Sequence, residues 1–405
     1  MSKTLAIAGG GAAGFFAAIN AVEMNPALRI VILEKSQHVL QKVKVSGGGR
    51  CNVTHNCTEP RELIRHYPRG SRELLGPFHT FQPADMVEWL ERKGVSLKTE
   101  SDGRMFPVTD NSQTIIHCFL HEAQRLGVEV RTGCGIIALQ QAASGWELSL
   151  TDQSMLHADY LLVATGNGGT MWNLLSKAGH TITEPVPSLF TFNIKDPRID
   201  GLAGVASTLS EVRIEGTKFT ASGPVLITHW GLSGPGILKL SAWAARELSS
   251  VNYDFIVRVN WDTRLNKESC MENLKEFKAE HNRTQVKSYS AIKIPHRLWC
   301  SLLSAHPNIL EMNWADVSNK HLEQITEALC SSYFRVTGKS IFKEEFVTAG
   351  GVSLKEVDFR TMQSRVLPGL YFAGEVLDVD AVTGGFNFQA AWTTAYIAAQ
   401  AIARS

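Results

Sequence analysis

The stretch TLAIAGGGAAGFFAAINAVEMN, residues 4–25, decides the fold because it allows two different interpretations. Lys3 followed by apolar and small residues is how a secretory signal begins, but such a signal needs an uninterrupted apolar helix of roughly 7–15 residues. Three consecutive glycines at positions 9–11 interrupt this run and disfavour a helix there. The stretch instead predicts a short buried strand, a glycine turn and then a helix.

The glycine turn has the spacing G-x-G-x-x-G, with Gly9, Gly11 and Gly14 at its fixed positions. In such a turn the first glycine allows the tight bend, the second lets the backbone approach a pyrophosphate, and the third lets the helix pack closely on the strand. The phosphates then lie against the free N–H groups at the start of the helix. A strand at Thr4–Ala8 and a helix to about Glu23 would frame this turn.

A second strand and an acidic residue follow at a spacing that suits a dinucleotide. LRIVILEK is typical of a buried strand because it is rich in β-branched residues. Glu34 stands near its end, about 20 residues after Gly14, where an acid binds the ribose hydroxyls of a dinucleotide. We therefore interpret residues 4–34 as a dinucleotide-binding unit rather than as a purely structural glycine turn.

The composition describes an ordinary globular protein. The chain has 405 residues, of which 44% are hydrophobic and 20% charged, and this length predicts two or three domains. A net charge of +1 gives no general attraction to nucleic acid or to anionic membranes. No apolar run approaches the roughly 18 residues of a membrane span. Seven scattered cysteines fit a reducing cytoplasm, and the 13 histidines show no metal-binding spacing. We expect a cytoplasmic protein without a metal or membrane partner, whose oligomeric state the sequence does not indicate.

A second glycine run lies in KVKVSGGGRCNVTH, residues 42–55. Its backbone N–H groups can approach a phosphate, with Arg50 as a charge-assisted donor. A flexible surface loop is the alternative. Because the run follows the first nucleotide-binding unit at close range, we favour a role in binding the cofactor.

The later sequence returns to the cofactor twice. After helical patterns at 83–93 and 112–126, several short strands precede an apolar strand at Tyr160–Ala164. Short strands covering one face of a parallel sheet are the layout of many FAD-binding flavoproteins. Two hundred residues later, a strand at Leu370–Ala373 is followed by an acid, a glycine turn and an amphipathic helix. FAD needs such a return, because its flavin half lies far from its adenosine half.

Between about Pro187 and Glu345 the pattern changes to strands followed by helices, without a second strand–GxGxxG–helix unit. This segment predicts a small antiparallel, barrel-like sheet with an inserted helical subdomain. The expected domains are residues 1–186 with 346–405 for cofactor binding, 187–262 with 336–345 for the antiparallel sheet, and 263–335 for the helices. Any NAD(P)H would have to bind at a less recognisable surface.

The chain resembles a bacterial flavoprotein family whose members are described as bile-acid-reductase-like, aminoacetone-oxidase-like or ribosomal-RNA dihydrouridine-synthase-like. The family is distantly similar to the glutathione-reductase superfamily. The resemblance rests on GGGAAG, KVSGGGRCNVTH, DGRMFPVTD, THWGLSGPGILKLSA, VTAGGVSLKEVDFRTMQS and PGLYFAGEVLDVDAVTGGFNFQAAW. It implies an α/β fold in which a Rossmann-like FAD-binding domain carries an inserted antiparallel β domain and a small helical subdomain.

The resemblance also implies noncovalently held FAD and assigns its contacts by motif. The pyrophosphate contacts are Gly9, Gly11, Ala13 and Gly14, and the adenosine end contacts Glu34 and Lys35. The second loop contributes Lys42, Gly47, Gly48, Gly49, Arg50, Cys51 and Asn52, and the adenosine side Ala164, Thr165 and Gly166. Near the ribityl chain and flavin are Glu375, Asp378, Gly385, Phe386 and Asn387, with Ala12, Ile136 and Gly374 as further contacts.

One departure from the family lies in GFNFQAAW, where Phe386 and Phe388 replace the more usual tyrosine and leucine. A phenol hydroxyl is therefore missing at position 386. Cys51 and Cys57 have a C-x5-C spacing that differs from the C-x4-C of disulfide reductases, so we expect two reduced cysteines rather than a redox disulfide. His229, inside a long family-like motif, either faces the active cavity or caps a strand end. No residue is assigned a catalytic role.

The expected function is that of an FAD-dependent oxidoreductase, an NAD(P)H-linked reductase of a small conjugated carbonyl or quinone-like acceptor. An oxidase of a small amine that produces hydrogen peroxide is one alternative. The other is a flavin-containing enzyme that reduces uridine in RNA, or an RNA-binding protein. Four arginines within residues 61–72 favour RNA, but a solvated helical face is the commoner meaning, so we expect nucleic acid not to be a partner.

Overall fold

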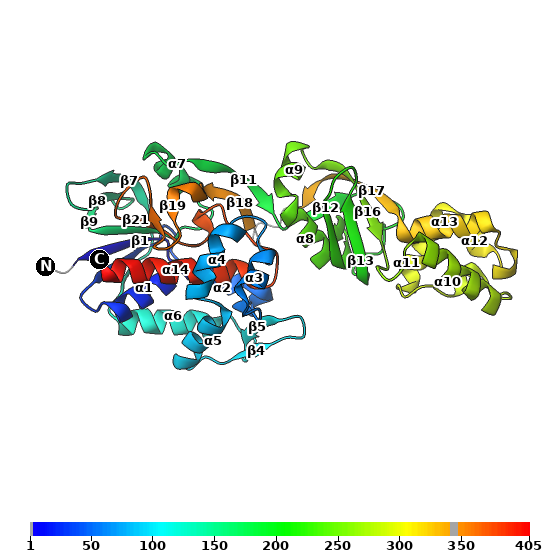
Figure 1. The fold of residues 1–405 in the computed structure, drawn as a ribbon, viewed down its shortest axis with the longest axis horizontal. Coiled ribbons are helices and arrows are strands. Elements are labelled where there is room, and N and C mark those ends of the chain that lie inside the picture. The colour runs from blue at the N-terminus through cyan, green and yellow to red at the C-terminus, as the bar shows by residue number, and fades with distance from the viewer. Residues whose placement is uncertain (1–2, 341–346) are drawn as a thin grey trace. The chain divides into compact units, whose positions relative to one another are not determined.

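The computed structural model describes residues 3–340 and 347–405, and these divide into two compact units. Unit 1 comprises the described residues up to Val186 and from Val347 onward, and unit 2 those from Pro187 to Ser340. Figure 1 shows the two ends of the chain in unit 1, where blue and red elements adjoin. Unit 1 is therefore built from both ends of the sequence, and unit 2 from its middle.

Unit 1 is organised by a seven-stranded sheet in the order β19-β20-β21-β10-β1-β2-β6. Strand β1 pairs in parallel with β2 and β10, and β10 pairs in parallel with β21. The bounds are β1 Thr4–Ala8, β2 Arg29–Leu33, β6 Glu129–Arg131, β10 Tyr160–Val163, β19 Val357–Asp358, β20 Gln363–Ser364 and β21 Leu370–Phe372. The central strands are almost wholly apolar and buried, as expected for parallel strands covered on both faces.

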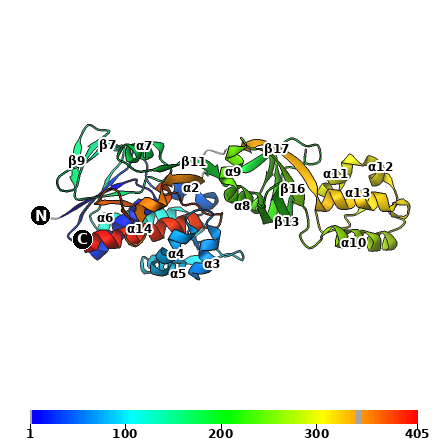
Figure 2. The ribbon, with the colours of Figure 1, turned by 45° about the horizontal axis from the view of Figure 1, so that its top comes forward.

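Helices cover one face of this sheet, and a small antiparallel sheet with one helix covers the other (Figures 1 and 2). The first layer contains α1 (Ala12–Met24), α6 (Gln113–Arg125) and α14 (Phe386–Arg404). Phe16 of α1 packs on Trp392 of α14, with ring centroids 5.4 Å apart. The second layer contains α7 (Gly169–Lys177) and the three strands β7 (Ile136–Gln141), β8 (Trp146–Leu150) and β9 (Met155–Ala158).

The rest of unit 1 consists of short elements that lie, in chain order, between β2 and β6, after α7, before β19 and after β21. They are α2 Gln41–Gly49, β3 Thr54–His55, α3 Pro60–Leu63, η1 Ile64–His66, α4 Ser71–Thr80, α5 Pro83–Arg92, β4 Leu97–Thr99, β5 Arg104–Pro107, β11 Ile182–Ser188, β18 Val347–Val352, η5 Leu354–Glu356 and η6 Gly374–Val376. Strands β3, β5 and β4 form one small sheet, and β11 pairs with β18.

Unit 2 is a closed barrel of six strands in the order β12-β15-β14-β13-β16-β17. The strands are β12 Thr191–Ile194, β13 Ala206–Ile214, β14 Thr220–Thr228, β15 Gly231–Ser233, β16 Asp254–Asn260 and β17 Ser332–Ser340, and α8 (Pro235–Trp243) and α9 (Ala245–Ser250) connect β15 to β16. Between β16 and β17 lie α10 Lys267–Glu280, η2 Val286–Ser288, α11 His296–Leu302, η3 Leu303–Ala305, α12 Pro307–Glu311, η4 Trp314–Asp316 and α13 Asn319–Cys330. The helices share one apolar core with the barrel.

The predicted fold class is confirmed: an α/β cofactor domain of Rossmann type carries an antiparallel β domain and a group of helices. Local details differ. The second glycine loop begins as a helix, α2. Among residues 3–340 and 347–405, no helix is long and apolar enough to cross a membrane.

Candidate functional site

The first glycine loop joins three strands at the carboxyl edge of the parallel sheet. Gly9 has φ 111° and donates its N–H to the carbonyl of Leu33 at 2.8 Å. A Cβ at Gly9 would lie 2.5 Å from the carbonyl oxygen of Ala164, and one at Gly14 would overlap the carbonyl oxygen of Gly9. Glycine is therefore required at both positions by the packing of the protein itself.

Gly11 shows the opposite environment. A Cβ built there would meet no protein atom within 4 Å. Helix α1 begins at the next residue, Ala12, and no side chain caps its N-terminus. The space in front of Gly11 is therefore free to receive a group that accepts hydrogen bonds from the first N–H groups of α1, as a pyrophosphate does.

Glu34 lies beside this loop and is bound to its backbone. The half-buried carboxylate accepts the N–H of Gly10 through one oxygen and the N–H of Ser36 through the other, both at 2.8 Å. Each carboxylate oxygen can accept more than one hydrogen bond, so lone pairs remain for ribose hydroxyls. Lys35, the next residue, is exposed. Glu34 thus shapes the loop, a role that the spacing alone did not indicate.

The second glycine loop forms a backbone turn suited to an anion. The helical backbone of α2 is interrupted at Ser46, after which Gly47, Gly48 and Gly49 have φ values of 57°, 69° and 84°. A Cβ at Gly48 or Gly49 would meet no atom within 4 Å. Successive N–H groups in turn conformations make concave anion-binding surfaces, so open space and free backbone coincide here.

Lys42 connects this loop to two distant parts of the chain. Its ammonium group is ion-paired with the carboxylate of Glu375 and donates to Oδ1 of Asn167 at 3.1 Å. A Cβ at Gly166 would lie 3.7 Å from the Glu375 carboxylate. The structure thus brings together predicted site residues from the second loop, from the turn after β10 and from the segment after β21.

The turn after β10 packs against the end of β1 and the first glycine loop, and the segment after β21 packs against the start of α1. Ala164 donates its N–H to the carbonyl of Ala8 at 2.8 Å. Gly374 donates to Oγ1 of Thr394 at 3.0 Å, and a Cβ there would lie 3.2 Å from the Cβ of Ala13. Thr165 Oγ1 is buried and has no hydrogen-bond partner among the described residues. A buried hydroxyl in this state fits a site that a polar ligand completes.

The second loop also contacts the start of α14. With its amide oriented to satisfy both groups, Asn52 accepts the N–H of Gly385 at 3.0 Å. Gly385 has φ 90°, and a Cβ there would lie 2.5 Å from the carbonyl oxygen of Thr54. Asn387 accepts the N–H of Ala381 at 2.9 Å and donates to its carbonyl at 3.1 Å. The N-terminus of α14 is therefore held in place by the loop.

Two histidines that the sequence analysis did not assign surround Phe386. His66 stacks on its ring at 4.0 Å and 9°, and His55 at 4.6 Å and 23°. Burial lowers the pKa of His55, although a hydrogen bond of 3.0 Å between Nε2 and the Asp102 carbonyl opposes this effect. Nδ1 of His55 is buried without a partner among the described residues. His55 directly follows the second glycine loop, and this position could have indicated that it lies near the site. No signal in the sequence marked His66.

Some predicted contacts are engaged elsewhere. Arg50 pairs with Glu100 at 2.7 Å and lies 3.9 Å from the ring centroid of Phe106, so its charge is already compensated. Ile136 is a buried residue at the start of β7, paired with Leu150. Asp378 is buried and donates its backbone N–H to the carbonyl of Val352.

The remaining motifs have structural surroundings. Cys51 and Cys57 are free thiols, and burial raises the pKa of Cys51 to about 12. In the arginine-rich segment, Arg69 is ion-paired with the buried carboxylate of Asp380, and Arg65 pairs with Glu62. Within the described residues, no group of three or more metal-ligating side chains occurs.

Comparison with known proteins agrees with this arrangement. A family model described as HI0933-like protein Rossmann domain matches residues 3–401. Ribosomal RNA dihydrouridine synthase of Escherichia coli (strain K12) is 29% identical over 407 residues, covering 97% of this chain and 96% of that protein. The 3-dehydro-bile acid delta(4,6)-reductase of Clostridium scindens is 27% identical over 424 residues, covering 98% of each.

A solved structure shares the fold. The 3-ketosteroid-delta4-(5alpha)-dehydrogenase from Rhodococcus jostii RHA1, in complex with 4-androstene-3,17-dione, superposes with a TM-score of 0.53 at 11% identity. The match covers 99% of this chain and 96% of that one. From the loops described above and these matches, the chain is an FAD-dependent oxidoreductase and belongs to the HI0933-like Rossmann-domain family.

Proposed function

We propose that the protein is a reductase that uses NAD(P)H, through FAD, to reduce a carbon–carbon double bond conjugated with a carbonyl group. The observation that carries this proposal is the set of backbone N–H groups around the open space at Gly11, Gly48 and Gly49. The names of the two relatives add the reaction type, because delta(4,6)-reductase and dihydrouridine synthase both describe the loss of a double bond. The chemistry that both names share is reduction, on different substrates.

In this proposal several stretches that are separated along the chain hold the cofactor. The N-terminus of α1 and the second glycine loop bind the pyrophosphate. Glu34 and Lys35 bind the adenosine end, and the turn at Thr165 lines the adenosine side. Glu375, with Lys42 beside it, and Asp378 lie toward the ribityl chain. The start of α14 at Phe386 lies beside the isoalloxazine ring. Two observations support the binding of FAD here: the buried Thr165 hydroxyl has no hydrogen-bond partner among the described residues, and the space at Gly11, Gly48 and Gly49 is open.

Bound FAD supplies hydride transfer between a donor and an acceptor. The chain's part is to bind and to orient. The positive end of α14 stabilises negative charge that develops near its first turn. The ring of His66 stacks on Phe386, the first residue of the same helix. His55, kept neutral by burial, presents Nδ1 as an acceptor if Nε2 carries the proton donated to the Asp102 carbonyl.

The test is a comparison of donors and acceptors with the FAD-loaded protein under anaerobic conditions. We expect NADH or NADPH to bleach the visible flavin absorption, and a steroid enone to restore it with loss of its conjugated ultraviolet absorption. Gly11→Val should contain no FAD and show neither change. If the parent protein contains no flavin, even after incubation with FAD, the proposal is refuted, because every part of it depends on bound FAD.

Two other functions are outcomes of the same experiment. Bleaching by a small amine alone, with hydrogen peroxide formed in air, would identify an oxidase. Reoxidation of the reduced protein by uridine-containing RNA, but not by small enones, would identify an RNA-modifying enzyme. The first relative's name favours that second candidate. The paired arginines do not, because Arg65 and Arg69 are held by carboxylates of the protein.

A further inference from the structure

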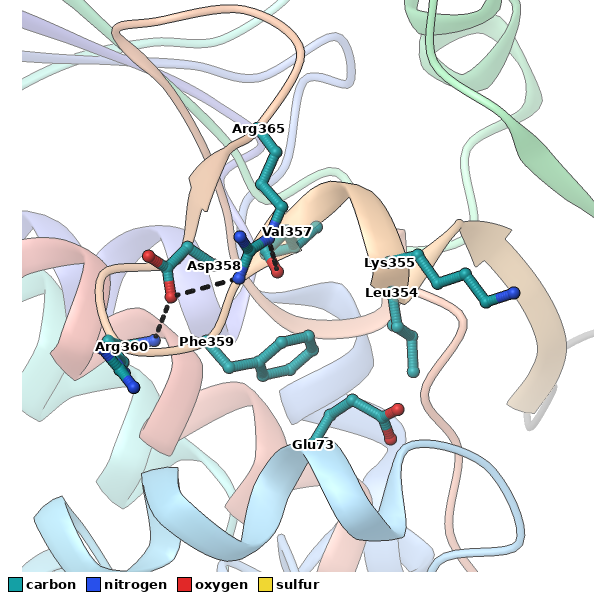
Figure 3. A pocket seen from close by; sticks show the side chains of 8 residues that line it. All are labelled: Glu73, Leu354, Lys355, Val357, Asp358, Phe359, Arg360 and Arg365. Carbon is teal, nitrogen blue, oxygen red and sulfur yellow. Dashed lines mark hydrogen bonds and ion pairs between the residues drawn. The ribbon is translucent and has the colours of Figure 1, made fainter.

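A cavity of about 470 Å³ lies in unit 1, apart from the glycine loops. One wall is α4, which contributes Glu73, and the other is the segment 354–365 around η5 and β19 (Figure 3). The lining residues are Glu73, Leu354, Lys355, Val357, Asp358, Phe359, Arg360 and Arg365. None of them belongs to the predicted FAD contacts, so the cavity needs its own explanation.

The charges of the cavity leave two cations uncompensated. Arg365 donates through Nε to the carbonyl of Val357 at 3.1 Å and lies 3.7 Å from the carboxylate of Asp358. That carboxylate also accepts the backbone N–H of Arg360 at 3.1 Å. The side chains of Lys355 and Arg360 are exposed and have no ion-pair partner among the described residues. Asp358 is thus occupied, and two cations remain for an anion.

The same cavity presents an unstacked aromatic ring. Phe359 is half-buried, and Figure 3 shows its ring between the segment 354–365 and α4. It stacks on no other aromatic side chain within the described parts of the chain. Glu73 lies at the opposite wall, also without an ion pair there. A flat ring, free cations and a carboxylate acceptor together suit a ligand with a base, a phosphate and donor groups.

Both walls of the cavity are joined to one segment of the cofactor site. Val352, two residues before the η5 wall, forms a parallel bridge with Leu377, and Arg69, just before α4, forms an antiparallel bridge with Asp380. Asp378, predicted to lie near the ribityl chain and flavin, stands between these two bridges. The cavity therefore adjoins the flavin end of the predicted site rather than a remote surface.

We propose that this cavity binds the adenosine phosphate end of the nicotinamide dinucleotide reductant. The adenine ring stacks on Phe359. Lys355 and Arg360, which Figure 3 shows on opposite sides of this ring, bind separate phosphate groups, and Glu73 accepts from the ribose or the exocyclic amine. The choice of a nicotinamide dinucleotide rests on the proposed function, whereas nucleotide binding by the cavity does not. Such a site would account for an NAD(P)H-linked enzyme that has no second glycine-rich dinucleotide unit.

Calorimetric titration of the FAD-loaded protein with ADP, 2′-phospho-AMP and inorganic phosphate tests the cavity directly. We expect Arg360→Ala and Lys355→Ala each to weaken nucleotide binding by about tenfold or more, as loss of a charge-assisted contact does. Phe359→Ala should weaken the binding of ADP but leave the affinity for inorganic phosphate unchanged. Lys218→Ala removes an exposed cation of unit 2 and is the matched control, with unchanged affinity.

Anaerobic rapid mixing with NADPH separates this inference from the proposed function. We expect the same variants to raise the NADPH concentration for half-maximal flavin reduction by a similar factor, with the limiting rate unchanged. If NADPH reduces the flavin equally well in parent and variants, the cavity assignment is wrong and the reductase proposal stands. If no nicotinamide dinucleotide reduces the flavin but the variants still lose affinity for ADP, the nucleotide site stands and the reductase proposal fails. Displacement of ADP by an RNA oligonucleotide that binds more tightly would overturn the assignment to the reductant.

Discussion

Gly11 and Gly14 share one motif, but their surroundings predict opposite consequences of adding a single methyl group. A Cβ at Gly11 meets nothing within 4 Å, whereas a Cβ at Gly14 falls well under 3.0 Å from the Gly9 carbonyl oxygen. The backbone of Gly11 has φ −92°, which any residue adopts. Gly11→Ala should therefore leave the protein without FAD as stable as the parent, while Gly14→Ala forces the loop or helix to shift.

The magnitudes follow from these contacts. Overpacking costs about 1–3 kcal/mol, and each kcal/mol lowers the melting temperature of a domain this size by about 2–4 °C. We expect Gly14→Ala to melt about 2–12 °C below the parent in the FAD-free form. In Gly11→Ala the added methyl group displaces the pyrophosphate from the N–H groups of α1. Because one charge-assisted hydrogen bond of about 1.5–3 kcal/mol is lost, the affinity for FAD falls about 10- to 100-fold.

The assay combines thermal unfolding followed by circular dichroism with fluorescence titration of FAD into the same FAD-free samples. The variants serve as each other's controls, because they make the same substitution three residues apart. The reasoning is refuted if Gly11→Ala binds FAD as tightly as the parent, or if it loses as much stability as Gly14→Ala. The first result would mean that the open space at Gly11 is not where the cofactor binds, and the second that the added methyl group at Gly11 does not lie in open space.

Three further predictions concern other groups. Glu34→Ala should weaken the binding of FAD. It should also lower the free energy of unfolding of the FAD-free protein by about 1–3 kcal/mol, because two backbone N–H groups lose an ionised acceptor. An unchanged denaturant midpoint would contradict this prediction. Cys51, with its pKa raised to about 12, should resist iodoacetamide at pH 8 in the native protein and react after unfolding, as mass spectrometry of the modified peptides can show. The ion pairs of Glu122 with Arg125 and Lys93 lower the pKa of its carboxyl to about 2, so they stabilise the fold above the unfolded pKa of about 4.5. That contribution should disappear as pH falls from about 4.5 to 2, and Glu122→Gln should lack this part of the pH dependence in urea titrations.

The parts of the site that could be predicted from the sequence are those fixed by local geometry. The turn at Gly9–Gly14 and the acid at Glu34 depend on the spacing of a strand, a turn and a helix, and the chain order alone carries that spacing. An amphipathic pattern after a glycine turn predicts helix α14, which begins at Phe386, directly after Gly385. The contacts of these residues with FAD stay predictions, as do the proposed boundaries of the helical subdomain at 263–335.

The parts that could not be predicted depend on pairs far apart in the sequence. Arg50 was expected to donate to a phosphate, but Glu100 lies close enough to pair with it only after β5 and β3 have formed a sheet. The stacking of His66 on Phe386 joins residues about 320 positions apart. Neither a spacing rule nor a charge pattern identifies such partners, because many arginines and histidines in the chain are equally plausible before folding.

The pairing of α1 with α14 has a consequence for how the chain folds. Asn25, at the end of α1, donates its side-chain amide to the carbonyl of Ala403, near the end of α14, at 3.1 Å. The two helices must therefore close a loop that spans 378 positions of the chain, and unit 2 is synthesised between them. Domains generally fold as units during synthesis, and closing a loop becomes only slowly more costly as it lengthens. Unit 2 can thus fold first and shorten the effective loop, while the nascent chain acquires a complete cofactor pocket only after its last helix has left the ribosome.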